Sequence, residues 1–317
     1  METFDMVLNH DSPYRIRVER FKNFVDRTNL TPISDLIATH RISEKKFSSL
    51  KASLLSYFRK VTNQHSIEES NFESSEVFNT KNITPNGALV PKSEYEVEYN
   101  EALSAYYSII SDIFEDKSLF CKLHFPVNFR LKTGIPDPRN ENRGLNTAIP
   151  HSDAWVGEES DGFNFYLPVL GDISRNRLRY YEIEEAELFG EDWLSPVASY
   201  NDHLEVIKQY RPNDSIIPKP GFLYISDFSI IHQTFLDTGA GNRISCDSGY
   251  WITDRITEVQ DHEDRRNEYI FSIPQIPETH WVDCLVSENS PHGSKPSHFS
   301  HYTKSSIRLV TKDATDK

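Results

Sequence analysis

Hydrophobic positions recur at intervals of three and four residues in two stretches of the first 120 residues. Between residues 43 and 62 this spacing is carried by Phe47, Leu50, Leu54 and Phe58. Ser43 stands where the helix would need an N-terminal cap. Between residues 94 and 115 one apolar face is formed by Leu103, Tyr106, Tyr107, Ile110 and Phe114. We therefore predict two helices in an N-terminal segment, residues 1–120, that packs on the rest of the chain.

A polar segment separates the two predicted helices. Residues 66–92 are rich in Ser, Asn and Glu, and the turn signal Asn86-Gly87 lies near their end. Long loops in compact domains are often lids over functional sites, although such a segment can also be a plain connector. We expect a loop at 66–92 and keep the lid as a hypothesis.

From Cys121 the pattern changes to short β-type runs separated by turn residues. Seven strands are predicted at 123–131, 148–153, 163–170, 178–182, 221–226, 230–236 and 243–251. A helix is expected between them at 200–210. This spacing favours a sandwich or barrel with the N-terminal helices packed outside it. Residues 121–255 would form this core and 256–317 a polar C-terminal extension, within one structural domain overall.

Composition narrows the functional classes. The 317 residues include 37% hydrophobic and 12% aromatic side chains, enough for a core. The formal net charge of −14 argues against nucleic-acid binding. No signal peptide, membrane span or cysteine framework is evident, so we expect a cytoplasmic protein without membrane contact. A small-molecule substrate is the expected partner, and whether the chain forms a homodimer is left open.

Three triplets place a histidine two residues before an acidic residue: His151-Ser152-Asp153, His203-Leu204-Glu205 and His262-Glu263-Asp264. In a strand these two side chains share a face and can converge on one ion, whereas in a helix they point about 200° apart. The second triplet falls in the expected helix, and the third lies in a run of charges. Only His151 and Asp153 come at the end of an apolar strand.

A third metal ligand is available downstream. His232 lies in an apolar β-type run, and two histidines with one carboxylate leave three positions open on a metal, as in non-haem Fe(II) sites. Arg243 and Ser245 follow in the next predicted strand. A guanidinium with a neighbouring hydroxyl suits a bidentate grip on a carboxylate.

These residues resemble the Fe(II)/2-oxoglutarate-dependent oxygenases, and among them the phytanoyl-hydroxylase-like branch. The likeness is carried by Pro150-His151-Ser152-Asp153, the strand at 163–170, the segment 219–224 followed by His232, and Arg243-x-Ser245. It covers roughly residues 121–251. The resemblance implies a double-stranded β-helix core of the jelly-roll or cupin-like type.

The resemblance also implies the roles of the site residues. His151, Asp153 and His232 would bind Fe(II), and Arg243 would hold the distal carboxylate of 2-oxoglutarate, assisted by Ser245 and Thr234. With O₂, such an enzyme converts 2-oxoglutarate to succinate and CO₂ and hydroxylates an unactivated carbon.

Alternation along two predicted strands adds candidates. Asn128 and Arg130 share a face and are expected to contact the cosubstrate, and Asn164 and Tyr166 share a face and are expected to contact substrate. Trp155, two residues after Asp153 in the loop that follows the motif, is a third substrate candidate.

The substrate class is predicted from charge alone. The loop after the motif carries Glu158, Glu159 and Asp161. A small polar or cationic metabolite, such as an amino acid, an amino sugar or a natural-product intermediate, is therefore favoured over a polyanion. Two alternatives remain open: a non-catalytic cupin-like barrel that binds a ligand, and a metal-dependent isomerase or epimerase on a similar barrel.

Overall fold

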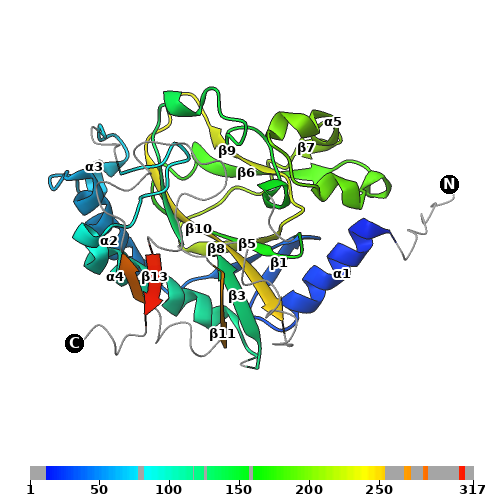
Figure 1. Ribbon diagram of the computed structural model, residues 1–317, viewed down its shortest axis with the longest axis horizontal. Helices are drawn as coiled ribbons and strands as arrows, with labels where there is room; N and C mark the ends of the chain where they lie inside the picture. The colour runs from blue at the N-terminus through cyan, green and yellow to red at the C-terminus, as the bar shows by residue number, and fades with distance from the viewer. Residues whose placement is uncertain are drawn as a thin grey trace.

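The computed structural model describes residues 12–77, 82–116, 118–124, 127–156 and 160–253, together with short strands at 268–272, 281–284 and 307–310. In these ranges the two larger of three β-sheets face each other, with helices against the outer side of the largest sheet (Figure 1). The prediction of a mainly β protein with flanking helices is confirmed. Within these ranges, no helix has the length and apolar character needed to cross a membrane.

The larger sheet is antiparallel and has the strand order β1-β2-β8-β5-β10-β3-β11, with β4 also paired to β10. Its strands are β1 (Thr31–Ser34), β2 (Ile37–Arg41), β3 (Phe120–His124), β4 (Asn128–Lys132), β5 (Phe163–Gly171), β8 (Phe222–Asp227), β10 (Arg243–Thr253) and β11 (Glu268–Ser272). The single strand expected at 123–131 is thus two strands, β3 and β4, which pair with successive parts of β10.

The smaller sheet consists of β7 (Tyr210–Pro212), β6 (Asn176–Ile183) and β9 (His232–Leu236), in that order. A separate pair is formed by β12 (Trp281–Cys284) and β13 (Ile307–Val310). Three short strands, β11 to β13, therefore lie in the region expected to be a polar C-terminal extension. One of them, β11, adds to the larger sheet through β3.

Five α-helices occur among the described residues: α1 (Pro13–Val25), α2 (Glu44–Thr62), α3 (Glu69–Phe72), α4 (Glu96–Ile110) and α5 (Leu204–Ile207). Ser43 caps α2 as expected, because its hydroxyl accepts a hydrogen bond from the Lys46 amide at 3.5 Å. The helix expected at 200–210 is shorter. It is a 3₁₀ turn followed by α5, and β7 begins at Tyr210.

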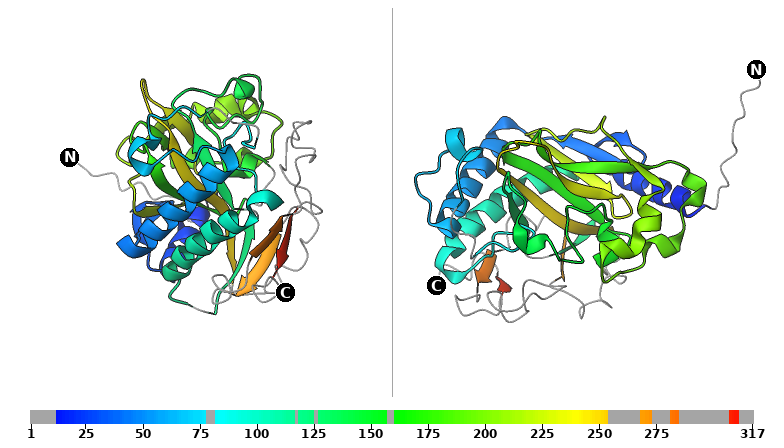
Figure 2. Two further views of the ribbon diagram at one scale, coloured as in Figure 1. Left: turned by 90° about the vertical axis from the view of Figure 1, so that its left-hand side faces the viewer. Right: turned by 90° about the horizontal axis from the view of Figure 1, so that it is seen from above.

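Aromatic rings join the helices to the outer face of the larger sheet. Phe129 on β4 is fully buried, and its ring centroid lies 6.0 Å from Tyr57 of α2 and 5.3 Å from Tyr99 of α4. Phe24 of α1 stacks on Phe163 of β5 at 4.4 Å. Figure 2 shows α2 and α4 side by side. One hydrophobic core therefore holds the N-terminal helices and the sheet together.

In segment 66–92, residues 83–92 are largely buried, whereas most of residues 66–76 are exposed. Phe72 and Leu89 are buried, and the Leu131 amide of β4 donates to the Gly87 carbonyl at 2.8 Å. Gly87 has a φ of 90°, and a side chain there would collide with the Leu131 carbonyl. Closure of this segment over a site remains a prediction.

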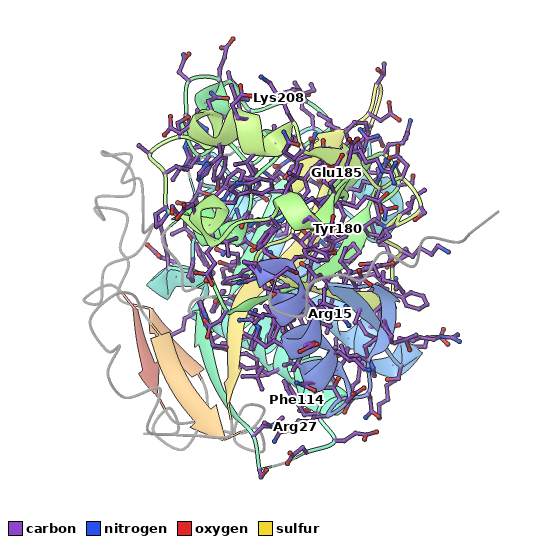
Figure 3. All side chains as sticks on the ribbon, turned by 90° about the vertical axis from the view of Figure 1, so that its right-hand side faces the viewer. Arg15, Arg27, Phe114, Tyr180, Glu185 and Lys208 are labelled. Atoms are coloured by element: carbon purple, nitrogen blue, oxygen red, sulfur yellow. The ribbon has the colours of Figure 1, made fainter. Side chains whose placement is uncertain are left out.

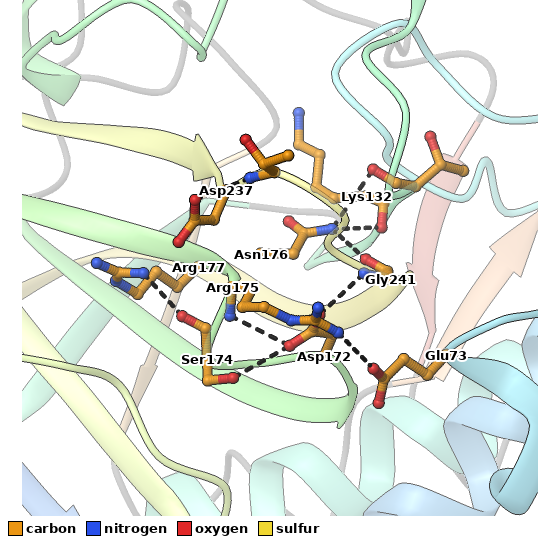
Figure 4. Close-up of polar contacts among 11 residues, drawn as sticks. Glu73, Lys132, Asp172, Ser174, Arg175, Asn176, Arg177, Asp237 and Gly241 are labelled. Atoms are coloured by element: carbon orange, nitrogen blue, oxygen red, sulfur yellow. Dashed lines mark hydrogen bonds and ion pairs between the residues drawn. The ribbon is translucent and has the colours of Figure 1, made fainter.

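Two turns at one end of the sheets are tied together by polar side chains (Figure 4). The Asp172 carboxylate, after β5, accepts from the Gly241 amide at 2.9 Å. The Asn176 amide group donates to the carbonyls of Lys132 at 2.9 Å and Gly241 at 3.0 Å. These bonds fix the start of β10, where Arg243 lies, relative to β4 and β6.

Replacing Phe129 with Ala should destabilise the fold by about 3–5 kcal/mol, because it removes a buried ring at the junction of α2, α4 and β4. Urea unfolding followed by circular dichroism measures this free energy. Val97→Ala on α4 is the control, since Val97 is 62% exposed and its loss should change stability by about 0.5 kcal/mol or less. Equal stabilities for the two variants would contradict the proposed core.

Candidate metal centre

Backbone pairing brings two distant histidines together. Residues 147–151 lie antiparallel to β9, and the amides and carbonyls of His151 and His232 exchange hydrogen bonds of 2.9 and 2.8 Å. A third bond joins the Thr234 amide to the Thr147 carbonyl at 2.7 Å. The two imidazole rings are consequently 4.5 Å apart, centroid to centroid.

 In the chain, residues 152–231 lie between the two histidines, so only the pairing of these strands makes them neighbours.

Asp153 reaches the histidines through a turn and not along a strand. The strand expected at 148–153 is limited to the bridge at His151, and Asp153 begins a 3₁₀ turn, Asp153–Val156. The Ser152 hydroxyl holds this turn, since it accepts from the Ala154 amide at 3.1 Å and donates to the Phe228 carbonyl. The same-face argument for residues i and i+2 was therefore wrong for this pair, and the turn produces the convergence instead.

The three side chains form a compact donor set. One ligand atom from each of His151, Asp153 and His232 lies within 4.8 Å of the others. The His232 Nε2 atom is 3.7 Å from an Asp153 carboxylate oxygen. The Asn164 side-chain amide donates to the other carboxylate oxygen and so fixes its direction.

Hydrogen bonds define which nitrogen of each ring faces the site. His151 Nδ1 lies 2.7 Å from the Ile149 carbonyl, and His232 Nδ1 lies 3.2 Å from the Ile230 carbonyl. A carbonyl oxygen only accepts, so both Nδ1 atoms carry a proton, and Nε2 is the nitrogen of each ring that is left to bind a metal. The Tyr200 ring stacks on His151 at 4.3 Å and holds its plane.

Burial keeps the His151 ring neutral. His151 is 3% exposed, and this burial, together with the nearby His232 ring, lowers its pKa from 6.5 to about 3. A neutral imidazole is the form that binds a metal. Two imidazoles and one carboxylate match a divalent transition metal with three remaining positions, the arrangement of non-haem Fe(II) sites. The residues present therefore fit the metal implied by the sequence.

A buried guanidinium lies on the facing sheet. Arg243, the first residue of β10, is 2% exposed, and one of its terminal nitrogens donates to the Tyr166 hydroxyl at 3.0 Å and the Asn176 carbonyl at 3.3 Å. Its Nε atom has no hydrogen-bond partner, and no described carboxylate forms an ion pair with Arg243. A buried charge without a counterion is costly, so this arrangement suits an anionic ligand. A carboxylate of 2-oxoglutarate fits that requirement.

The other expected cosubstrate residues are divided between the two facing sheets. Register along β4 and β10 places Arg130 opposite Ser245 and Asn128 opposite Asp247. Arg130 forms an ion pair with Asp247, so its charge is already compensated. Thr234 Oγ1 lies 3.4 Å from Thr147 Oγ1 on the smaller sheet. Whether these residues contact a cosubstrate remains a prediction.

The expected substrate contacts have structural partners of their own. Asn164 donates to Asp153, and Tyr166 accepts from Arg243, so both position members of the site. Trp155 is fully buried in a second hydrophobic cluster, and its indole donates to the Trp193 carbonyl at 2.5 Å. These contacts give Trp155 a packing role. Glu158 and Glu159 lie outside the described residues.

Sequence reasoning missed two inner-face residues. Lys132 continues the alternation of Asn128 and Arg130, but the predicted strand ended one residue too early to include it. Tyr180, labelled in Figure 3, is opposite His232 in the smaller sheet, and its buried hydroxyl has no hydrogen-bond partner. Alternation along the predicted strand 178–182 could have placed Tyr180 on the inner face, but nothing in the sequence singled it out.

No known family model matches the chain, and no similar sequence is found among curated proteins. Among solved structures, the non-heme α-ketoglutarate-dependent epimerase SnoN from nogalamycin biosynthesis is similar at 10% identity and a TM-score of 0.39, over 78% of this chain and 90% of that one. An N-substituted L-amino acid dioxygenase from Burkholderia ambifaria AMMD is 8% identical with a TM-score of 0.32, over 68% and 85%. AviO1 from Streptomyces viridochromogenes Tue57 is 12% identical with a TM-score of 0.35, over 76% and 96%. At such low scores, function has to be argued from the chain's own residues.

Asp153→Ala should abolish iron retention while leaving the fold intact, because it removes the only carboxylate of the donor set. Iron content of the purified protein after anaerobic loading measures this effect. Asp161→Ala is the matched control, since Asp161 is an exposed acidic residue on the same loop and should retain iron. Iron bound at the wild-type level by Asp153→Ala would show that the triad is not the metal site.

Proposed function

We propose that the chain is an Fe(II)- and 2-oxoglutarate-dependent dioxygenase that hydroxylates an unactivated carbon of a small metabolite. The observation that carries the proposal is the combination of a His-Asp-His donor set with a buried, uncompensated Arg243 on the facing sheet. A metal site alone would suit many enzymes. A metal site with a carboxylate-binding guanidinium suits a cosubstrate that bridges the two.

The order of the strands supports a double-stranded β-helix for the core. Taken along the chain, β4, the segment 147–151 and β5 alternate between the larger and smaller sheets. The strands β6 and β7 stay in the smaller sheet, and β8, β9 and β10 alternate again. This gives two facing sets of four strands, the arrangement of a jelly-roll or cupin-like barrel.

In this proposal the iron, when bound, supplies the oxidising chemistry that couples decarboxylation of 2-oxoglutarate to hydroxylation with O₂. The chain's own residues prepare the site. The Ile149 and Ile230 carbonyls orient the two imidazoles, Asn164 orients the Asp153 carboxylate, and Tyr166 orients the Arg243 guanidinium. Burial of the histidines and of Arg243 keeps water away from both ends of the cosubstrate.

The substrate class is proposed from the acidic residues after the metal motif. Asp161 is exposed, and Glu158 and Glu159 precede it. They favour a polar or cationic metabolite, such as an amino acid, an amino sugar or a natural-product intermediate. A metal-dependent isomerase and a non-catalytic barrel are the rival functions. Neither has a need for a guanidinium without a counterion opposite the metal ligands.

Arg243→Ala should weaken 2-oxoglutarate binding about 30-fold or more. Loss of one partner of a buried charge pair costs about 2–5 kcal/mol, and about 1.4 kcal/mol corresponds to a factor of ten. Iron binding should hardly change, because Arg243 is not among the metal ligands. Arg243→Lys should recover only part of the loss, since an ammonium cannot reproduce the planar fork.

Titration of the anaerobic Fe(II) protein with 2-oxoglutarate, followed by metal-to-ligand absorption, gives these affinities. Arg211→Ala is the control, since the Arg211 side chain is 63% exposed and pairs with Glu182 at the surface. Equal affinities for wild type and Arg243→Ala would remove 2-oxoglutarate from the proposed function.

A further inference from the structure

Two cationic side chains lie directly opposite each other on the inner face of the larger sheet. Lys132 on β4 and Arg243 on β10 are cross-strand partners in an antiparallel pair. Side chains at such positions share a face and approach within about 5 Å at their β-carbons, so two like charges there are destabilising. The electrostatic repulsion between these two side chains must therefore be offset by another contact.

No described carboxylate neutralises either charge. The Lys132 Nζ atom lies 3.0 Å from Thr147 Oγ1, a neutral acceptor, and no ion pair joins Lys132 or Arg243 to a described acidic side chain. Two acids that interact electrostatically with Lys132 form ion pairs elsewhere: Asp247 pairs with Arg130, and Asp137 pairs with Arg139.

Most of the charged groups around Lys132 lower its pKa. Burial lowers the pKa of Lys132 well below its usual value, and the nearby Arg130, Arg243 and Arg143 lower it further, while Asp247 opposes them. In the ligand-free protein these surroundings therefore favour the neutral amine of Lys132 over its ammonium form. A bound anion would reverse this effect, because it favours the charged form.

Hydrogen bonds connect Lys132 with the strand that carries the metal ligand His232. Lys132 contacts Thr147, and Thr147 lies 3.4 Å from Thr234, two residues after the ligand His232 on β9. Asn176 holds the two cations in register, since its side chain donates to the Lys132 carbonyl and its own carbonyl accepts from Arg243. In Figure 4 the Lys132 side chain points away from this backbone network.

We propose that Lys132 is a second carboxylate-binding residue, which holds the distal carboxylate of 2-oxoglutarate together with Arg243 and takes up a proton from solvent when the cosubstrate binds. The proposal rests on the proposed function of the site. The proton adds to the neutral Lys132 amine and gives an ammonium beside the incoming carboxylate. No bond to the cosubstrate is formed or broken.

The sign of the pH dependence follows from this coupling. Below the pKa of Lys132 in the ligand-free protein the side chain is already charged, and binding takes up no proton. Above that pKa, and below the raised pKa of the complex, binding takes up as much as one proton per site. Affinity for 2-oxoglutarate should accordingly fall as pH rises through this range.

Isothermal titration of the Mn(II)-loaded protein with 2-oxoglutarate tests the proposal, because Mn(II) avoids turnover and the metal ligands are already deprotonated. Titrations from about pH 6 to about pH 9, each in two buffers of different ionisation enthalpy, count the protons taken up. Wild type should show uptake that increases with pH. Pyruvate, which lacks the distal carboxylate, should bind with no uptake.

Three variants distinguish the effect of the Lys132 charge on affinity from the uptake of a proton by Lys132. Lys132→Met should lose affinity at least tenfold near neutral pH and lose the uptake. Lys132→Arg should keep most of the affinity but lose the uptake, since a guanidinium stays charged at every pH used. Lys208→Met is the control, because the Lys208 side chain is 64% exposed, and it should behave as wild type.

Wild-type affinity and uptake in Lys132→Met would overturn the role of Lys132 while leaving the proposed function intact. Absence of proton uptake by the wild-type protein at every pH would overturn the coupling, and this measurement needs no variant to fold. Failure of the metal-loaded wild type to bind 2-oxoglutarate at all would instead overturn the proposed function.

Discussion

The pairing of residues 147–151 with β9 is the contact on which the site depends. Two backbone hydrogen bonds between His151 and His232 fix the distance between their rings, and the turn held by Ser152 then brings Asp153 to the same point. If this pairing shifted by one residue, one histidine would face away from the other, because side chains alternate along a strand. The proximity of the two candidate histidine ligands is thus a consequence of strand register.

The same register determines the charges on the facing sheet. β10 pairs with β4 so that Arg243 meets Lys132, Ser245 meets Arg130 and Asp247 meets Asn128. The outer face of these strands is apolar and packs on α2 and α4, so their polar side chains lie on the inner face. Arg130 and Asp247 form an ion pair there, whereas Lys132 and Arg243 have no described carboxylate as a partner. The excess positive charge at the Lys132–Arg243 end complements an anionic cosubstrate.

Many elements and candidate residues of the site could be predicted from the sequence, but the geometry of the site could not. The helix capped by Ser43 follows from periodicity, and the three candidate metal ligands follow from residue types and from the resemblance to an oxygenase family. Asp153 was expected on a strand and lies in a 3₁₀ turn, because the Ser152 contact to Phe228 involves a distant part of the chain. α1 was missed since its apolar spacing is weak, and it is held by contacts such as Phe24 on Phe163. The position of Lys132 opposite Arg243 depends on the pairing of β4 with β10, which links distant parts of the chain.

Thermal melting of the wild-type protein with Mn(II) alone, with 2-oxoglutarate alone and with both tests the central claim that metal and cosubstrate share one site. A ligand that binds only the folded state raises the melting temperature according to its affinity. If 2-oxoglutarate bridges the His-Asp-His centre and Arg243, it should stabilise the metal-loaded protein well beyond the sum of the two separate effects. Stabilisation by the metal alone, with none added by 2-oxoglutarate, would contradict a 2-oxoglutarate-dependent enzyme.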